Sequence, residues 1–172
     1  MNLGYMTLRR TGRLLLMLAA QILILNHVHF LGYCTPLLMG YMILCFNSDT
    51  TRISLLLWGF ATGLIFDIFS NTMGIGAASC TLLAMIQPRI LKINKPRDEG
   101  GGFAPTLTTM GLGTYTIYTL TGMAVLHTTF YMLEIFNLAN FWLTIGAIIG
   151  GTVISTLIVL CIQLISLGGK KD

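Results

Sequence analysis

Charged side chains are scarce in this chain. Its 172 residues include 10 Lys and Arg and 6 Asp and Glu, which is 9% charged residues against 55% hydrophobic residues. A soluble domain of average composition carries about 25% charged residues. The deficit excludes an ordinary soluble domain and indicates an integral membrane protein. The net charge of +4 does not indicate nucleic-acid binding, because the basic residues flank apolar runs and form no soluble basic face.

Residues that usually carry catalysis or bind metals are also sparse. The four cysteines are Cys34, Cys45, Cys80 and Cys161. They form no CxxC pair and therefore indicate neither disulfides nor zinc. His27 and His29 would diverge by about 200 degrees on a helix and cannot share a metal ion. No acid pair is spaced for general acid–base work, and no GxxxxGK phosphate-binding loop is present. We therefore expect no enzymatic activity, no metal and no cofactor.

Long apolar runs dominate the sequence instead. Because about 20 apolar residues span a bilayer as a helix, six stretches are predicted to be transmembrane helices. They are Leu14–Phe30, Leu31–Phe46, Ile53–Phe69, Ile75–Ile93, Leu107–Leu133 and Phe141–Leu167. The second differs from the others, since its uninterrupted core from Pro36 to Phe46 is short and Pro36 suits a first helical turn. It could be a tilted, half-buried or re-entrant segment, which leaves five spans as an alternative.

The basic residues favour six spans with both termini in the cytoplasm. In that topology the inner segments are the N-terminus, the second and fourth loops, and the C-terminus. Those segments contain Arg9, Arg10, Arg13, Arg52, Arg89, Lys92, Lys95, Arg97, Lys170 and Lys171. Five spans would put the two basic termini on opposite sides of the membrane. The sequence therefore predicts a multi-pass protein of the bacterial inner (cytoplasmic) membrane.

The arginines at the N-terminus also resemble the start of a signal peptide, and Arg9-Arg10 resembles a twin-arginine signal. The apolar run that follows continues past Ala20 without a small-x-small cleavage site, and more membrane sequence comes after it. We therefore expect an uncleaved first helix.

One loop has an extended polar sequence, NKPRDEGGGFAP, at Asn94–Pro105. Its run of three glycines predicts a flexible cytoplasmic linker, residues 94–105, between the fourth and fifth helices. No internal repeat and no soluble domain is visible in the sequence. Residues 1–172 are therefore predicted to form a single helical membrane domain.

One acidic residue lies inside a predicted membrane helix. Gly59, Gly63 and Asp67 are spaced four apart, so on a helix they form one narrow stripe. An ionised aspartate near the bilayer centre costs roughly 2.5 to 3.5 kcal/mol on insertion scales, which makes Asp67 the first functional candidate. The basic residues are predicted at the cytoplasmic side, ~21 Å along the helix from Asp67 at 1.5 Å per residue. No basic side chain of this chain is expected to reach it.

Several groups could satisfy Asp67. They are a proton, a hydroxyl or histidine from a neighbouring helix, the exposed N–H groups where the fourth helix begins near Gly74-Ile75-Gly76, or a donor from another protein. The Asn71–Gly74 turn is short enough to fold that helix start back, so a structural cap is slightly favoured over a partner contact. Removing only the charge, as in Asp67→Asn, is expected to leave the amount of folded protein nearly normal. Gly63→Leu is expected to lower that amount.

Two small-residue motifs suggest close helix packing. They are Gly59-x-x-x-Gly63 and Gly146-x-x-x-Gly150, the latter extended by Gly151. Packing within the chain is favoured over a partner interface for both. The threonines of the fifth predicted helix are expected to bond back to its own carbonyls, with a polar groove as the alternative.

The GF-x-x-GL-x-x-D core at Gly59–Asp67 is followed by Gly74-Ile75-Gly76-Ala77 and by Pro88-Arg89 late in the fourth helix. This pattern resembles the bacterial rod shape-determining protein MreD family, with the specific part in residues 55–92. The small size, the arginine-bearing N-terminus and the nearly loop-free layout agree along most of the chain.

The resemblance implies an inner-membrane component of the elongation machinery. It implies partners: an MreC-like bitopic protein, a RodA-type glycosyltransferase, a penicillin-binding transpeptidase and the cytoskeletal MreB. It also implies a six-helix fold similar to the substrate-binding subunits of energy-coupling-factor transporters. The expected function is a non-enzymatic scaffold for peptidoglycan synthesis and cell shape; the alternative is a small-molecule-binding subunit of a vitamin-type transporter. The candidate packing or partner-contact residues are Gly59, Gly63, Asp67, Gly74, Gly76, Gly146 and Gly150.

Overall fold

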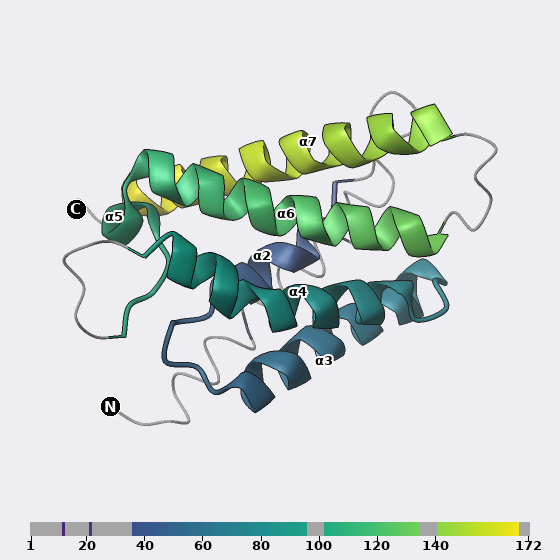
Figure 1. Ribbon diagram of the computed structural model, residues 1–172, viewed down its shortest axis with the longest axis horizontal. Helices are drawn as coiled ribbons and strands as arrows, with labels where there is room; N and C mark the ends of the chain where they lie inside the picture. The colour runs from purple at the N-terminus through teal and green to yellow at the C-terminus, as the bar shows by residue number, and fades with distance from the viewer. Residues whose placement is uncertain (1–11, 13–20, 22–35, 96–101, 135–140, 169–172) are drawn as a thin grey trace.

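The computed structural model describes residues 12, 21, 36–95, 102–134 and 141–168 (Figure 1). Within these residues the chain is helical and contains no strand. The helices are α2 (Met39–Leu44), α3 (Arg52–Ser70), α4 (Ile75–Ile93), α5 (Leu107–Met110), α6 (Leu112–Glu134) and α7 (Phe141–Gly168). The predicted all-helical class is confirmed for the described part of the chain.

Helices α3 and α4 form an antiparallel hairpin, and both follow the sequence prediction closely. Helix α3 ends at Ser70, and the next residue, Asn71, has a left-handed backbone with φ 55° and donates its N–H to the carbonyl of Asp67. Gly74 then adopts φ 81° immediately before α4. Such backbone angles favour glycine and asparagine, and they allow the chain to reverse within a few residues.

A spanning helix is not seen over the described part of the predicted helix Leu31–Phe46. Residues 36–46 hold only α2, which has six residues, all of them buried. A helix of six residues is too short to cross a bilayer, and residues 31–35 lie outside the described residues. Of the first predicted helix, Leu14–Phe30, only Gln21 is among the described residues. The rest of that prediction lies outside them.

The fifth predicted helix, Leu107–Leu133, is divided in two at Gly111. Helix α5 begins with a capping box, in which Thr106 and Thr109 bond each other's backbone N–H groups at 3.3 and 3.1 Å. Gly111 has φ 74°, a value that ends one helix before α6 begins. Within α6, Thr116 and Thr121 donate to the carbonyls four residues earlier, as predicted. The six described residues of the 94–105 segment, 94–95 and 102–105, contain no helix.

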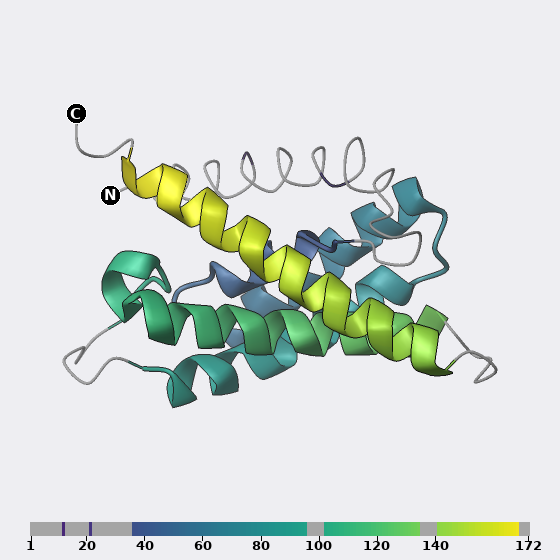
Figure 2. The ribbon, with the colours of Figure 1, turned by 90° about the horizontal axis from the view of Figure 1, so that it is seen from above.

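The long helices pack in a row. Helix α4 lies between α3 and α6, and α6 packs in turn against α7, which crosses it at an angle (Figure 2). The short α2 packs against α3, α4 and α6. Two of the described helices are long and apolar enough to cross a membrane: all of α3, and residues Trp142–Ser166 within α7.

Candidate functional site

The glycine stripe of α3 faces α4 at very short range. A Cβ atom added at Gly59 would lie 2.8 Å from the Cβ of Ala84, and one added at Gly63 would lie 2.3 Å from the carbonyl oxygen of Gly76. Real Cβ atoms essentially never approach so closely. The backbones of α3 and α4 meet because these positions lack side chains, and the predicted packing within the chain is confirmed for Gly59 and Gly63.

Asp67 lies at the end of this stripe and is 5% exposed. Its Oδ1 accepts a hydrogen bond from the N–H of Gly76 at 2.8 Å, and its Oδ2 accepts one from the N–H of Ala77, also at 2.8 Å. The hydroxyl of Thr72 donates to Oδ1 as well. Among the groups proposed to satisfy Asp67, the structure therefore selects the N–H groups at the start of α4 together with one hydroxyl.

This cap works because the first N–H groups of a helix have no partner inside the helix and carry partial positive charge. Each carboxylate oxygen of Asp67 takes one of those groups, so the acid is stabilised without a basic side chain. An asparagine replaces one of the two oxygens with an NH2 group, which is a donor and cannot accept from the N–H that faces it. The geometry thus changes the expected effect of Asp67→Asn from nearly neutral to destabilising.

Gly76 is needed at the same contact. A Cβ there would lie 2.7 Å from Oδ1 of Asp67 and 2.8 Å from the ring of Phe66. Four of the predicted residues, Gly59, Gly63, Asp67 and Gly76, therefore form one continuous contact. Gly74 shapes the turn that brings the two helices together.

The second glycine motif is not part of this contact. Gly146 is exposed on α7, and a Cβ added there would meet no described atom within 4 Å. Gly150 is partly exposed. Gly151 does face a neighbour, since its added Cβ would lie 2.5 Å from Cδ2 of His127 on α6. Among the described residues, close packing within the chain is thus seen at Gly151 and not at Gly146.

A set of buried polar side chains that was not predicted from the sequence holds the N-terminal end of α2. Gln21 accepts from the N–H of Leu38 at 2.7 Å and donates to the carbonyl of Pro36 at 2.9 Å. Ser155 of α7 accepts from the N–H of Leu37 at 3.0 Å. These bonds satisfy backbone groups that a six-residue helix cannot satisfy itself.

The other end of α2 is held in the same way. Tyr118 of α6 donates its hydroxyl to the carbonyl of Leu44 at 2.9 Å, and Gln87 of α4 donates to that hydroxyl at 3.0 Å and to the carbonyl of Phe46 at 3.3 Å. Irregular backbone inside a membrane protein is tolerated where protein groups satisfy it. Glutamines within apolar runs were the signal in the sequence that could have indicated this clamp.

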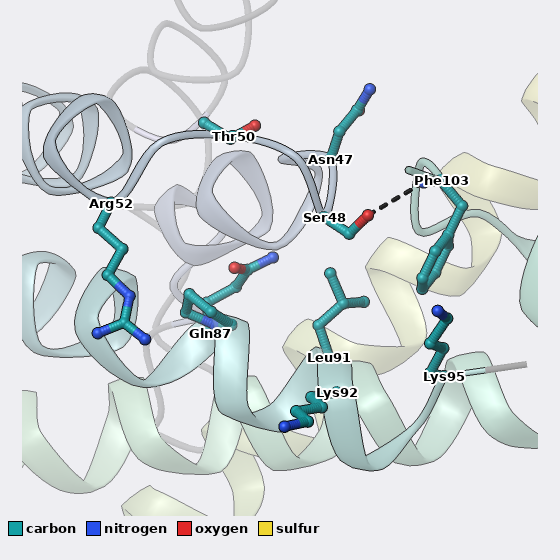
Figure 3. Close-up of a pocket in the computed structure, with 10 residues that line it drawn as sticks. Asn47, Ser48, Thr50, Arg52, Gln87, Leu91, Lys92, Lys95 and Phe103 are labelled. Carbon is teal, nitrogen blue, oxygen red and sulfur yellow. Dashed lines mark hydrogen bonds between the residues drawn. The ribbon is translucent and has the colours of Figure 1, made fainter. Parts of the chain in front are cut away.

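A pocket lies at the end of α3 opposite to Asp67, with a volume of about 350 Å³. Its walls come from the 47–52 loop, the last turns of α4, and Phe103 (Figure 3). Three of its lining residues are basic: Arg52, Lys92 and Lys95. These three residues were predicted to lie at one membrane face, but no pocket between them was predicted.

Fold and contacts together define, over the described residues, an all-helical protein with two helices suited to a membrane and an apolar core in which a few buried polar side chains bind the backbone. The chain matches no protein-family model, and no curated protein or solved structure is significantly similar to it.

Proposed function

We propose that this protein is a non-enzymatic scaffold of the bacterial inner membrane, of the MreD kind. In this proposal it binds an MreC-like bitopic protein and helps to organise peptidoglycan synthesis and cell shape. The RodA-type glycosyltransferase, the penicillin-binding transpeptidase and MreB complete the proposed assembly. The observation that carries the proposal is the contrast between buried polar side chains, which bind the protein's own backbone, and exposed apolar faces on the helices.

The buried polar side chains include residue types that can take part in catalysis, such as aspartate and tyrosine. Both oxygens of Asp67 bind the start of α4, and Gln87 and Tyr118 bind the end of α2. Groups engaged in this way stabilise the fold and do not present a reactive centre.

The exposed apolar faces lie on the two helices suited to a membrane. On α3 the exposed residues Ile53, Leu57, Phe60, Leu64 and Ile68 recur every three or four positions, so they share one face. The glycine stripe and Asp67 are buried on the side that packs against α4. On α7, Ile149, Val153 and Leu157 form a similar exposed row. Such faces contact lipid or another membrane helix.

The proposed topology keeps both termini in the cytoplasm. The basic side chains Arg52, Lys92 and Lys95 share one pocket, so these positive charges gather at one end of the bundle. The turn at Asn71–Gly74 joins the opposite ends of α3 and α4. The positive-inside rule assigns the basic end to the cytoplasm, which puts Asp67 near the outer face.

Photocrosslinking tests the proposal. A photoreactive residue is placed at Phe60 on α3 or at Val153 on α7, with Met73 in the exposed turn as the control position. Crosslinked partners are purified from native membranes and identified by mass spectrometry. We expect a bitopic MreC-like protein from at least one helix face and none from Met73.

The alternative function, a transporter subunit, predicts a different result. It would retain a vitamin-like small molecule through purification or associate with an ATPase-bearing module. Recovery of such a ligand, with no bitopic protein crosslinked to either helix, would reject the scaffold proposal.

A further inference from the structure

The basic pocket has walls that are joined to each other. The N–H of Ser48 donates to the carbonyl of Phe103 at 3.0 Å, and the N–H of Phe103 donates to the hydroxyl of Ser48 at 3.1 Å. This pair of bonds ties the loop before α3 to the segment before α5, and one of the two is drawn in Figure 3. These two bonds fix the two walls relative to each other, and neither involves a lysine side chain.

The charged residues that line the pocket are all basic, while Asp49, which lies beside them, accepts a hydrogen bond from the lining residue Ser48 at 3.3 Å. Arg52, Lys92 and Lys95 line the pocket, and none of its lining residues is acidic. In the described part of the chain these three side chains form no ion pair. The C-terminal end of α4 carries a partial negative charge of about half an elementary charge, which repels an anion. The three full positive charges of the basic side chains outweigh it. Arg52 enters from the start of α3, whereas the lysines come from the end of α4 and the residues just after it (Figure 3).

The pocket also has an apolar wall. Leu91 and Phe103 line it and are almost fully buried, with 3% and 5% of their surfaces exposed. A volume of about 350 Å³ is at the lower end of the roughly 300–1,000 Å³ typical of ligand pockets. It can hold a charged headgroup, but not a whole lipid.

We propose that this pocket binds a phosphate group. A guanidinium can engage phosphate oxygens in a bidentate manner, and two ammonium groups add charge from the other side. Basic pockets between membrane helices at the cytoplasmic surface suit anionic lipid headgroups. The same chemistry would also recognise a soluble phosphate compound. This inference does not depend on the scaffold function.

Native mass spectrometry of the purified full chain in an uncharged detergent tests the proposal. Three probes are titrated separately: phosphatidylglycerol, zwitterionic phosphatidylcholine, and inorganic phosphate. We expect phosphatidylglycerol to bind more tightly than phosphatidylcholine. Arg52→Gln and Lys92→Gln should each weaken binding about fivefold, because a basic residue near an anionic surface contributes about 1 kcal/mol. The double variant should lose about 25-fold by the same estimate.

Arg89→Gln is the matched control. Arg89 is exposed on the same helix as Lys92, carries the same charge as Arg52 and does not line the pocket. It should leave binding unchanged. Because all three altered side chains are exposed, the variants should fold, and their unfolding transitions serve as the check.

The outcomes are distinct. Equal losses for Arg89→Gln and Arg52→Gln would indicate diffuse surface attraction and overturn the site. Unchanged binding in the double variant would overturn it as well. If the site is present, displacement of phosphatidylglycerol by an equal amount of inorganic phosphate assigns a soluble ligand. Resistance to that displacement assigns the lipid.

Discussion

The cap on Asp67 leads to a graded prediction for the stability of the α3–α4 hairpin. In Asp67→Asn the remaining carbonyl oxygen can accept from Gly76 and Thr72, which leaves the amide group facing the N–H of Ala77. One charge-assisted hydrogen bond is lost and one buried N–H is unpaired, so we expect the free energy of unfolding to fall by about 2–3 kcal/mol. Asp67→Ala leaves both N–H groups unpaired and should cost about 3–5 kcal/mol.

The third variant in the series is Thr72→Val, which removes a single hydroxyl donor while keeping the shape of the side chain. It should cost about 1 kcal/mol. Asp49→Asn is the control, because Asp49 is an exposed aspartate outside the hairpin, and it should change stability by less than about 0.5 kcal/mol. The expected loss of unfolding free energy is therefore largest for Asp67→Ala, followed by Asp67→Asn, Thr72→Val and the control Asp49→Asn.

The assay is reversible unfolding of the purified protein in mixed micelles as the fraction of a denaturing detergent is raised. Trp58 reports on the transition, because it lies on α3 with its ring centroid 6.3 Å from that of Phe46. Equal stability of the wild type, Asp67→Asn and Asp67→Ala would refute the idea that the carboxylate holds the start of α4. Cell shape adds a second measurement: normal rods with Asp67→Asn at normal protein level would mean that the charge is dispensable for function.

Three further predictions concern packing, the clamp on α2, and topology. Gly63→Ala should lower the free energy of unfolding by about 1–3 kcal/mol, because the added Cβ must push the backbones of two helices apart. Gly146→Ala should leave the free energy of unfolding nearly unchanged. Equal effects of the two variants would contradict the packing described for α3. Tyr118→Phe should cost about 1–3 kcal/mol, because it leaves buried polar groups unpaired, and a melting temperature equal to that of wild type would argue against the clamp. A reporter inserted at Gly102 should be cytoplasmic and one at Asn71 external; an external signal from Gly102 would reject the six-span topology.

The parts of the fold that sequence could predict are those fixed by short-range patterns. Helices α3 and α4 were predicted within a residue or two, because apolar runs end there at the Asn71–Gly74 turn and at the polar linker. The cap on Asp67 was among the expected alternatives, since its donors Gly76 and Ala77 lie only nine and ten residues further along the chain.

The parts that could not be predicted depend on partners far apart in sequence. The end of α2 is held by Tyr118, 74 residues from Leu44, and the clamp from Gln87 reaches back 41 residues to Phe46. The local sequence of an apolar run does not indicate which distant residues will bind its backbone. For this reason the sequence of residues 31–46 suggested a spanning helix. The break at Gly111 was missed because glycine also occurs inside membrane helices, where it breaks nothing.

The clamp on α2 also sets an order of events during synthesis of the chain. The N–H of Leu37 is satisfied by Ser155, which lies 118 residues later. At about 5–20 residues per second, the ribosome needs roughly 6 to 24 s to supply that partner. Until then the start of α2 lacks one of its acceptors, and an unpaired backbone group is costly in hydrocarbon. We expect this segment to stay within the insertion machinery or near the membrane surface at first. It should become buried in the protein only after α7 has been synthesised.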